Sequence, residues 1–310
     1  MTGADTAAMT PSRSTASPRP AAPTGVTPFV LGNALLGTIG LFVLHAQAGP
    51  LVTTWARCAF GLLALTGWVL LRRQGRALRL HRINALAVLA ISCLLIAAWG
   101  LFFWAIPHTG TGVAVVLFHV QPLWVLLLGA AWLKEPVGRR QVLAVGVAML
   151  GLVLATGVLG ADGAARTPGY WAGVAACLVG ALCTAGVTLI ARRLQDARAA
   201  VPPGVLAWWQ CAIGTLVLAP WAAAPVAATP GAAWPWLAGL GVLHTGLAYT
   251  LLYAGLAHLG AARAAVLQFV YPAVAIALDG VVLGQALSPV QAFGMAVMLG
   301  AVTVAERRAL

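Results

Sequence analysis

Long apolar stretches alternate with short polar segments along most of the chain. Each of ten such stretches is close to the roughly 20 residues that a helix needs to cross a bilayer. Prolines stand at or near the ends of several of them, where helices begin or turns form. The pattern predicts an all-α membrane protein with ten transmembrane helices. We place the spans at residues 28–47, 50–71, 84–106, 110–133, 140–160, 168–191, 203–224, 233–256, 262–284 and 288–305.

Composition supports a membrane protein over a soluble one. Hydrophobic residues make up 61% of the 310 residues and charged residues 8%, whereas soluble domains carry about 25% charged residues. The net charge of +12 could favour nucleic acid, but the basic residues separate the apolar stretches and form no single basic face with aromatic residues. We therefore expect no nucleic-acid partner. The five cysteines lie inside apolar stretches and indicate neither a disulfide framework nor a metal cluster, and no cofactor is expected.

The chain contains an internal repeat with an offset of 150 residues. Residues 110–122, GTGVAVVLFHVQP, correspond to residues 260–272, GAARAAVLQFVYP. The match includes a proline, Pro122 or Pro272, inside an apolar run, which a membrane helix bundle tolerates better than a soluble core. Such a match at half the chain length indicates a duplicated structural unit.

The basic residues predict the orientation in the membrane. With the N-terminus in the cytoplasm, sixteen of the 18 Lys and Arg residues fall on the cytoplasmic side, Arg166 falls outside, and Arg57 lies within a span. We therefore expect both termini in the cytoplasm, in the cell (inner) membrane. Residues 1–27, rich in Ser, Thr, Pro and Ala, are expected to form a disordered cytoplasmic tail.

Ten spans in two similar halves give five spans to each half. An odd number forces the second half to enter from the opposite face, so residues 28–160 and 168–305 are predicted to be inverted repeats. Inverted repeats are a recurrent architecture of transporters, which bind their substrate near mid-bilayer where the repeats meet.

Several landmarks resemble those of the drug/metabolite transporter superfamily, in its ten-span EamA-type branch. They are Arg57 in the second span, Pro122, LKEP at residues 133–136, AYTLLYAGL at residues 248–256, Pro272, and glycine-bearing fifth and tenth spans. The resemblance implies that spans one to four and six to nine line a central cavity and that spans five and ten support them. One departure is Gln285, where the family often has an acid comparable to Glu135.

Arg57 is the strongest candidate for substrate binding, because a cation inside the bilayer is costly unless it is paired or reaches water. A structural tether is the alternative, with comparable weight. Asp279 is the only acid plainly inside a span and lies at a similar depth, so we predict that it pairs with Arg57. The alternative places Asp279 at the wet membrane interface.

Polar residues cluster around the two prolines. Gln268, Pro272 and Asp279 share one helix face, and His119 and Pro122 share another. Each proline leaves a carbonyl without its helical donor, so Pro122 and Pro272 are candidate hinges, with a static kink as the alternative. His119 and His244 lie near the middle of their spans, where either a proton carrier or a neutral, hydrogen-bonded ring is possible. Further candidates for the substrate site are Trp99, Gln121, Trp209, Gln210, Tyr249 and Tyr271.

The leading interpretation is a secondary transporter that exports small metabolites such as amino acids by alternating access, as a monomer or homodimer in contact with membrane lipids. Relatives that pump cationic drugs need an acid in the first span, and residues 28–47 hold none. Nucleotide-sugar or sugar-phosphate exchange would need several cations in the cavity. A channel, a scramblase or an intramembrane enzyme stays open as another class, although neither H-E-x-x-H nor G-x-S-x-G occurs.

Overall fold

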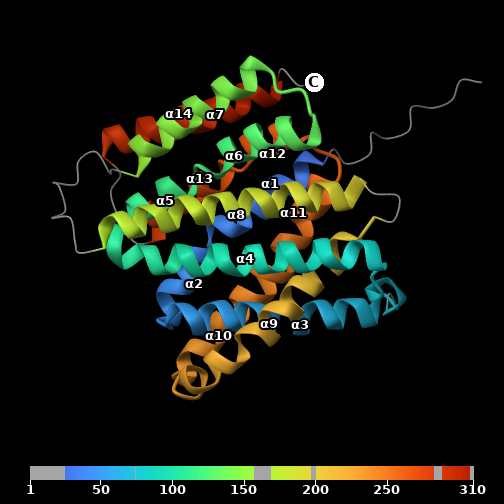
Figure 1. The fold of residues 1–310 in the computed structure, drawn as a ribbon. Coiled ribbons are helices and arrows are strands. Elements are labelled where there is room, and N and C mark those ends of the chain that lie inside the picture. Colours follow the sequence, from blue (N-terminus) through green and yellow to red (C-terminus); the bar gives the residue numbers. More distant parts are fainter. Residues whose placement is uncertain (1–24, 74, 157–168, 197–199, 283–287, 308–310) are drawn as a thin grey trace, which may run out of the picture.

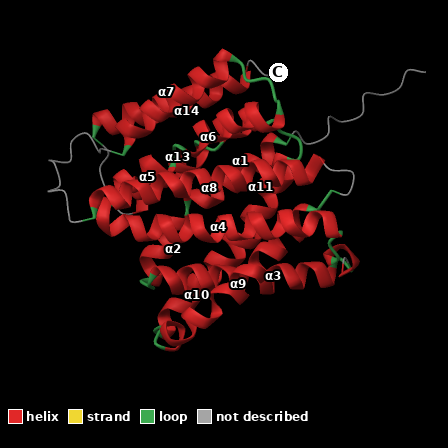
Figure 2. Ribbon diagram, viewed as in Figure 1, coloured by secondary structure: helices red, strands yellow, loops and turns green. Residues whose placement is uncertain are grey.

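The computed structural model describes residues 25–73, 75–156, 169–196, 200–282 and 288–307, so most of the predicted tail lies outside the described residues. Within them every regular element is helical (Figure 2), which confirms the predicted all-α class. The first half forms α1 (Val26–Gly37), α2 (Ile39–Ala46), α3 (Pro50–Leu71), η1 (Gly75–Leu78), α4 (Arg82–Thr109), α5 (Thr111–Phe118), α6 (Gln121–Leu128), η2 (Gly129–Leu133) and α7 (Arg139–Ala155). The second half forms α8 (Tyr170–Asp196), α9 (Pro203–Ala227), η4 (Gly231–Ala233), α10 (Trp234–Gly241), η5 (Val242–Leu247), α11 (Ala248–Leu256), α12 (Ala261–Leu267), α13 (Val270–Val282) and α14 (Pro289–Arg307).

Nine helical stretches among the described residues are long and apolar enough to cross a membrane. With 17 residues, α7 is slightly shorter; it is the fifth span in chain order and brings the number among the described residues to ten. Several spans are composite: α1 and α2 make the first, α5, α6 and η2 the fourth, α10, η5 and α11 the eighth, and α12 and α13 the ninth. The chain is therefore a multi-pass membrane protein in which four of the spans consist of more than one helical segment.

Helices of the two halves pack in pairs that the repeat relates to each other. The fifth span, α7, lies against the tenth, α14, and the second span, α3, lies against the seventh, α9. In the same way α4 lies against α8, and the equivalent pair, α11 and α1, also packs closely. Figure 1 shows α7 and α14 together at one edge and α3, α9 and α10 at the opposite edge, with α1, α8 and α11 between them. A twofold axis between two inverted five-helix repeats produces this arrangement.

Where α3 contacts α9, the side chains of the two helices show the same symmetry. A Cβ atom added to Gly214 would lie 2.5 Å from the sulfur of Cys58, and one added to Gly61 would lie 2.9 Å from the sulfur of Cys211. Each glycine thus accommodates the cysteine of the other helix. Small residues at such crossings let membrane helices approach closely, which is their main source of packing energy.

The fourth and ninth spans break at equivalent positions. The α5 helix ends and α6 begins just before Pro122, and α12 ends and α13 begins just before Pro272. Proline lacks the N–H that would continue the helical hydrogen bonds, so the carbonyl four residues earlier loses its usual donor. At the second break the carbonyl of Gln268 accepts a hydrogen bond from the N–H of Tyr271 instead, at 3.1 Å. The breaks lie where the candidate hinges were expected, and movement at them stays a prediction.

Candidate functional site

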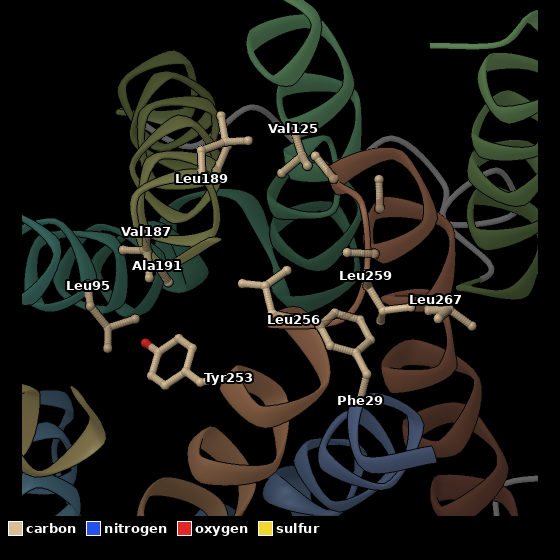
Figure 3. Packing of buried hydrophobic residues seen from close by; sticks show 14 of the residues in the cluster. Phe29, Leu95, Val125, Val187, Leu189, Ala191, Tyr253, Leu256, Leu259 and Leu267 are labelled. Atoms are coloured by element: carbon tan, nitrogen blue, oxygen red, sulfur yellow. The ribbon is translucent and has the colours of Figure 1, made fainter. Parts of the chain in front are cut away.

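A cavity of about 170 Å³ lies where the two repeats meet. Its lining comes from α1 to α6, α8, α11 and α13, and from the two helix breaks. Four of the residues labelled in Figure 3 belong to the lining: Leu95 of α4, Val187 of α8, and Tyr253 and Leu256 of α11. Its mostly apolar lining with a few polar groups is typical of the concave sites that bind small molecules.

Much of the cavity wall consists of residues that the 150-residue repeat relates to each other. Four of the first-repeat residues are aromatic, and four of their second-repeat partners carry a hydroxyl or an amide. One pair, Trp99 and Tyr249, meets directly, with ring centroids 5.9 Å apart in an edge-to-face arrangement. The repeat therefore supplies the lining with equivalent pairs of residues whose members differ in chemistry. The five pairs are Trp99 and Tyr249, Phe102 and Leu252, Phe103 and Tyr253, Phe118 and Gln268, and Gln121 and Tyr271.

Arg57 lines the cavity from α3 and is almost completely buried, with 3% of its surface exposed. Its Nε donates a hydrogen bond to Oγ1 of Thr245 at 3.2 Å, and its guanidinium carbon lies 4.1 Å from the ring centroid of Trp99. It is the only Lys, Arg, Asp or Glu among the described residues of the lining. Neutral hydroxyl and aromatic contacts orient this cation, but they do not neutralise it.

The predicted pair of Arg57 with Asp279 falls partly outside the described residues. Asp279 lies within α13, but its side chain is not among those that the structure describes. Among the side chains that it does describe, no carboxylate makes an ion pair with Arg57. The pairing stays a prediction.

The helix breaks bring His119 and Tyr271 together on the cavity wall. Their rings stack with centroids 5.2 Å apart and an interplanar angle of 24°. His119 Nδ1 lies 2.8 Å from the carbonyl oxygen of Val115. Beside them, Nε2 of Gln121 donates a hydrogen bond to Oγ1 of Thr188 at 3.2 Å. The break therefore joins α5, α6, α8 and α13 at one polar corner of the cavity.

Three residues expected at the substrate site do not line this cavity. Trp209 donates its indole N–H to the carbonyl of Leu78 at 3.1 Å. His244 is fully buried in η5, and its Nε2 lies 2.6 Å from Oγ1 of Thr38. Gln210 accepts a hydrogen bond from the Tyr253 hydroxyl at 2.6 Å. All three contact neighbouring helices, and the structure places their side chains behind the cavity wall.

Gln210 instead borders a smaller cavity, whose lining also includes Trp99, Thr245 and Tyr249. The resemblance implied that the seventh span would line the central cavity, but α9 reaches only this smaller one. The reason is the tight crossing with α3, which places α9 behind its partner. As the resemblance implied, α7 and α14 contribute nothing to the lining among the described residues.

Sequence reasoning missed several lining residues, including Phe102, Phe103, Phe118 and Tyr253. The repeat itself held the signal, because adding 150 to Trp99 or Phe103 gives Tyr249 or Tyr253. A second match between the two halves of the sequence has an offset of 153 residues. Residues 55–61, WARCAFG, match residues 208–214, WWQCAIG, which makes Gln210 the equivalent of Arg57.

Ion pairs close one end of the bundle. Glu135 of the first repeat accepts a hydrogen bond from the N–H of Ala261, the first residue of α12, at 2.6 Å. Its other carboxylate oxygen lies 3.6 Å from Nε of Arg192 in α8. Nearby, Arg263 makes an ion pair with Glu306 of α14, with Nε 2.9 Å and 3.0 Å from the two carboxylate oxygens. Arg192 lies one turn beyond the cavity residue Thr188, so the contacts of Glu135 join the two repeats just past the cavity, whereas the pair of Arg263 and Glu306 lies within the second repeat.

Two inverted repeats with a cavity between them define a membrane transporter architecture, and comparison with known proteins gives the family. Residues 24–157 and residues 171–306 each match the model of the EamA-like transporter family, so the chain belongs to that family. It is 25% identical over 262 residues to the uncharacterized transporter YxxF of Bacillus subtilis (strain 168), covering 84% of this chain and 82% of that protein. One solved crystal structure has the same fold, with a TM-score of 0.79 at 21% identity, covering 91% of this chain and 95% of the other.

Membership in this family makes the chain a transporter of small molecules across a membrane, and not an enzyme. Its contacts accordingly include membrane lipids and a small-molecule substrate. The cavity between the repeats is the part of the described structure that can hold such a substrate.

Proposed function

We propose that the chain is a secondary transporter of the cell (inner) membrane that exports small metabolites such as amino acids by alternating access. Arg57 is the observation that carries the proposal. Insertion scales assign about 2.5–3.5 kcal/mol to an Arg at the centre of a membrane helix. A buried cation whose contacts among the described residues are all neutral is suited to receive an anionic group of the substrate.

The rest of the lining suits a small molecule with one anionic end and an apolar body. The aromatic residues of the first repeat offer a large apolar surface. A single cation suits one carboxylate better than the several charges of a nucleotide-sugar or a sugar phosphate, which are usually held by more than one basic residue. These two features favour amino acids and similar metabolites over the phosphorylated substrates of related transporters.

Alternating access follows from the inverted repeats, because exchanging the conformations of the two halves turns an inward-open state into an outward-open one. Under the predicted orientation, with both termini in the cytoplasm, the contacts of Glu135 with Arg192 and Ala261 lie on the cytoplasmic side of the cavity. In this state the cytoplasmic end is held closed. The matching breaks before Pro122 and Pro272 are the proposed hinges.

Counterflow in proteoliposomes tests the proposal. Purified full-length protein is reconstituted into vesicles loaded with one unlabelled amino acid, and uptake of the same labelled amino acid is followed across a panel, with and without a pH gradient. We expect transient, saturable accumulation for at least one amino acid. Flux that never saturates and shows no counterflow would support a channel or scramblase instead, and accumulation of none of the panel would contradict amino-acid transport.

A further inference from the structure

Gln268 has a buried side-chain oxygen without a hydrogen-bond partner among the described residues. Its Oε1 is shielded from solvent and accepts no hydrogen bond from them, although the side chain lines the cavity. Buried polar atoms in folded proteins are nearly always paired, and each exception calls for an explanation. An unpaired acceptor on the wall of a binding cavity points to a ligand that brings a donor.

The backbone around Gln268 does not need this side chain. Its N–H donates to the carbonyl of Ala264 at 3.1 Å, and its own carbonyl accepts from the N–H of Tyr271 at 3.1 Å. The side chain therefore plays no part in capping the broken helix. The equivalent break in the first repeat has Phe118 at this position, so the shared fold has no requirement for an amide there.

A second acceptor lies on the same wall. The carbonyl of Val115 can only accept a hydrogen bond, so Nδ1 of His119, 2.8 Å away, must carry the proton between them. In a neutral imidazole the other nitrogen, Nε2, is then an acceptor. His119 stacks on Tyr271, three residues after Gln268. The paired helix breaks thus provide acceptors, whereas α3 provides the cation Arg57.

We propose that Gln268 receives the ammonium group of a zwitterionic substrate whose carboxylate is held by Arg57, with His119 as a neighbouring acceptor. This proposal rests on the proposed function and deepens it. The site then recognises both ends of an amino acid and disfavours the same carboxylate without its amine. The aromatic wall of the first repeat holds the apolar side chain and does not distinguish the two compounds.

Three related compounds separate the two ends of the substrate: phenylalanine, 3-phenylpropanoate, which lacks the amine, and phenethylamine, which lacks the carboxylate. Dissociation constants are measured for purified full-length protein from the change in tryptophan fluorescence, since Trp99 lies in the cavity wall. We expect the wild type to bind phenylalanine at least about tenfold more tightly than 3-phenylpropanoate, the effect of losing one charge-assisted hydrogen bond.

Gln268→Leu should abolish this preference by weakening the binding of phenylalanine to the level of 3-phenylpropanoate, with the affinity for 3-phenylpropanoate unchanged. Gln268→Glu, which keeps an acceptor and adds charge, should retain the preference for phenylalanine. Gln195→Leu is the matched control, because that glutamine bonds the carbonyl of Val201 outside the cavity. It should leave the ratio as in the wild type, and size-exclusion profiles of all variants report folding.

Equal binding of the two acids by the wild type would overturn the role of Gln268, as would a Gln268→Leu variant that loses affinity for both to the same extent. Failure of the proposed function looks different. In that case neither acid binds the wild type, or Arg57→Gln leaves the affinity for both acids unchanged.

Discussion

The two walls of the cavity share a backbone plan but differ in chemistry. Residues of the first repeat present Trp99 and three phenylalanines, whereas their equivalents in the second repeat present Tyr249, Tyr253 and Gln268 among others. The duplication therefore fixes where side chains face the cavity, and later divergence decides what they bind. A lining that combines an apolar aromatic surface with polar groups suits a substrate with an apolar body and a polar head.

The same contrast holds at the α3 and α9 crossing. Cys58 and Cys211 pack alike against glycines of the opposite helix, but the preceding residues, Arg57 and Gln210, are a cation and a neutral amide. Only Arg57 reaches the main cavity. The residues that pack the two helices together are therefore equivalent in both repeats, whereas the residues at the binding position differ.

Removing the charge of Arg57, which distinguishes the first repeat from the second, should have the largest effect on transport. Arg57→Gln makes α3 resemble α9 and deletes the anchor for a carboxylate, so counterflow should fall by about 100-fold or more, since charged hydrogen bonds contribute roughly 1.5–3 kcal/mol each. Arg57→Lys should restore part of the activity, because the charge remains but the fork of donors does not. Near wild-type counterflow in Arg57→Gln would assign Arg57 a structural role only.

Disturbing the symmetric packing should affect stability more than transport. In Gly214→Ala the new methyl group meets the sulfur of Cys58, and overpacking of this kind costs about 1–3 kcal/mol. The thermal unfolding temperature of the detergent-solubilised protein should fall by several degrees, and adding Cys58→Ala should recover most of the loss. Gly40→Ala is the control, because a Cβ there meets nothing within 4 Å. Equal unfolding temperatures for Gly214→Ala and Gly40→Ala would refute the tight crossing.

Weakening the contacts of Glu135 at one end of the cavity should shift the equilibrium between the inward-open and outward-open states. Glu135→Gln removes the charge that faces Arg192 and Ala261, which should favour opening at that end by about 1–2 kcal/mol. In sided vesicles the half-saturation concentration should drop several-fold on the Glu135 side. An unchanged value on both sides would show that this cluster does not hold the cavity closed.

The smallest effect on transport is expected from Tyr253, which lines the cavity but donates its hydroxyl hydrogen bond to Gln210 outside it. Tyr253→Phe makes this position resemble Phe103 and removes the hydrogen bond to Gln210, which should cost about 0.5–1.5 kcal/mol of stability. Counterflow should change by no more than a few-fold. A larger loss of counterflow, with stability unaltered, would place the Tyr253 hydroxyl in direct contact with the substrate.

The fold could be predicted from the sequence because hydropathy and the repeat are strong signals. Ten apolar stretches and an offset of 150 residues gave the spans, the equivalence of the two halves and the interruptions at Pro122 and Pro272, whereas the packing pairs of the spans came only from the structure. The prolines were informative because they change the backbone directly, whatever surrounds them.

The site could be predicted only in part, because depth in the membrane does not determine which way a side chain faces. Arg57, Trp99, His119, Gln121, Tyr249, Gln268 and Tyr271 line the cavity as expected. His244 has the same apparent depth but faces Thr38, and Trp209 faces Leu78. Helix rotation decides these cases, and in nearly uniformly apolar spans the sequence pattern leaves rotation undetermined.

A structure of the full-length protein with a transported amino acid bound would test the account most directly. We predict density for the ligand in the cavity between the repeats, with its carboxylate within hydrogen-bonding distance of the Arg57 guanidinium and its side chain against the aromatic wall of the first repeat. A substrate bound elsewhere, or bound in this cavity without contact to Arg57, would contradict it.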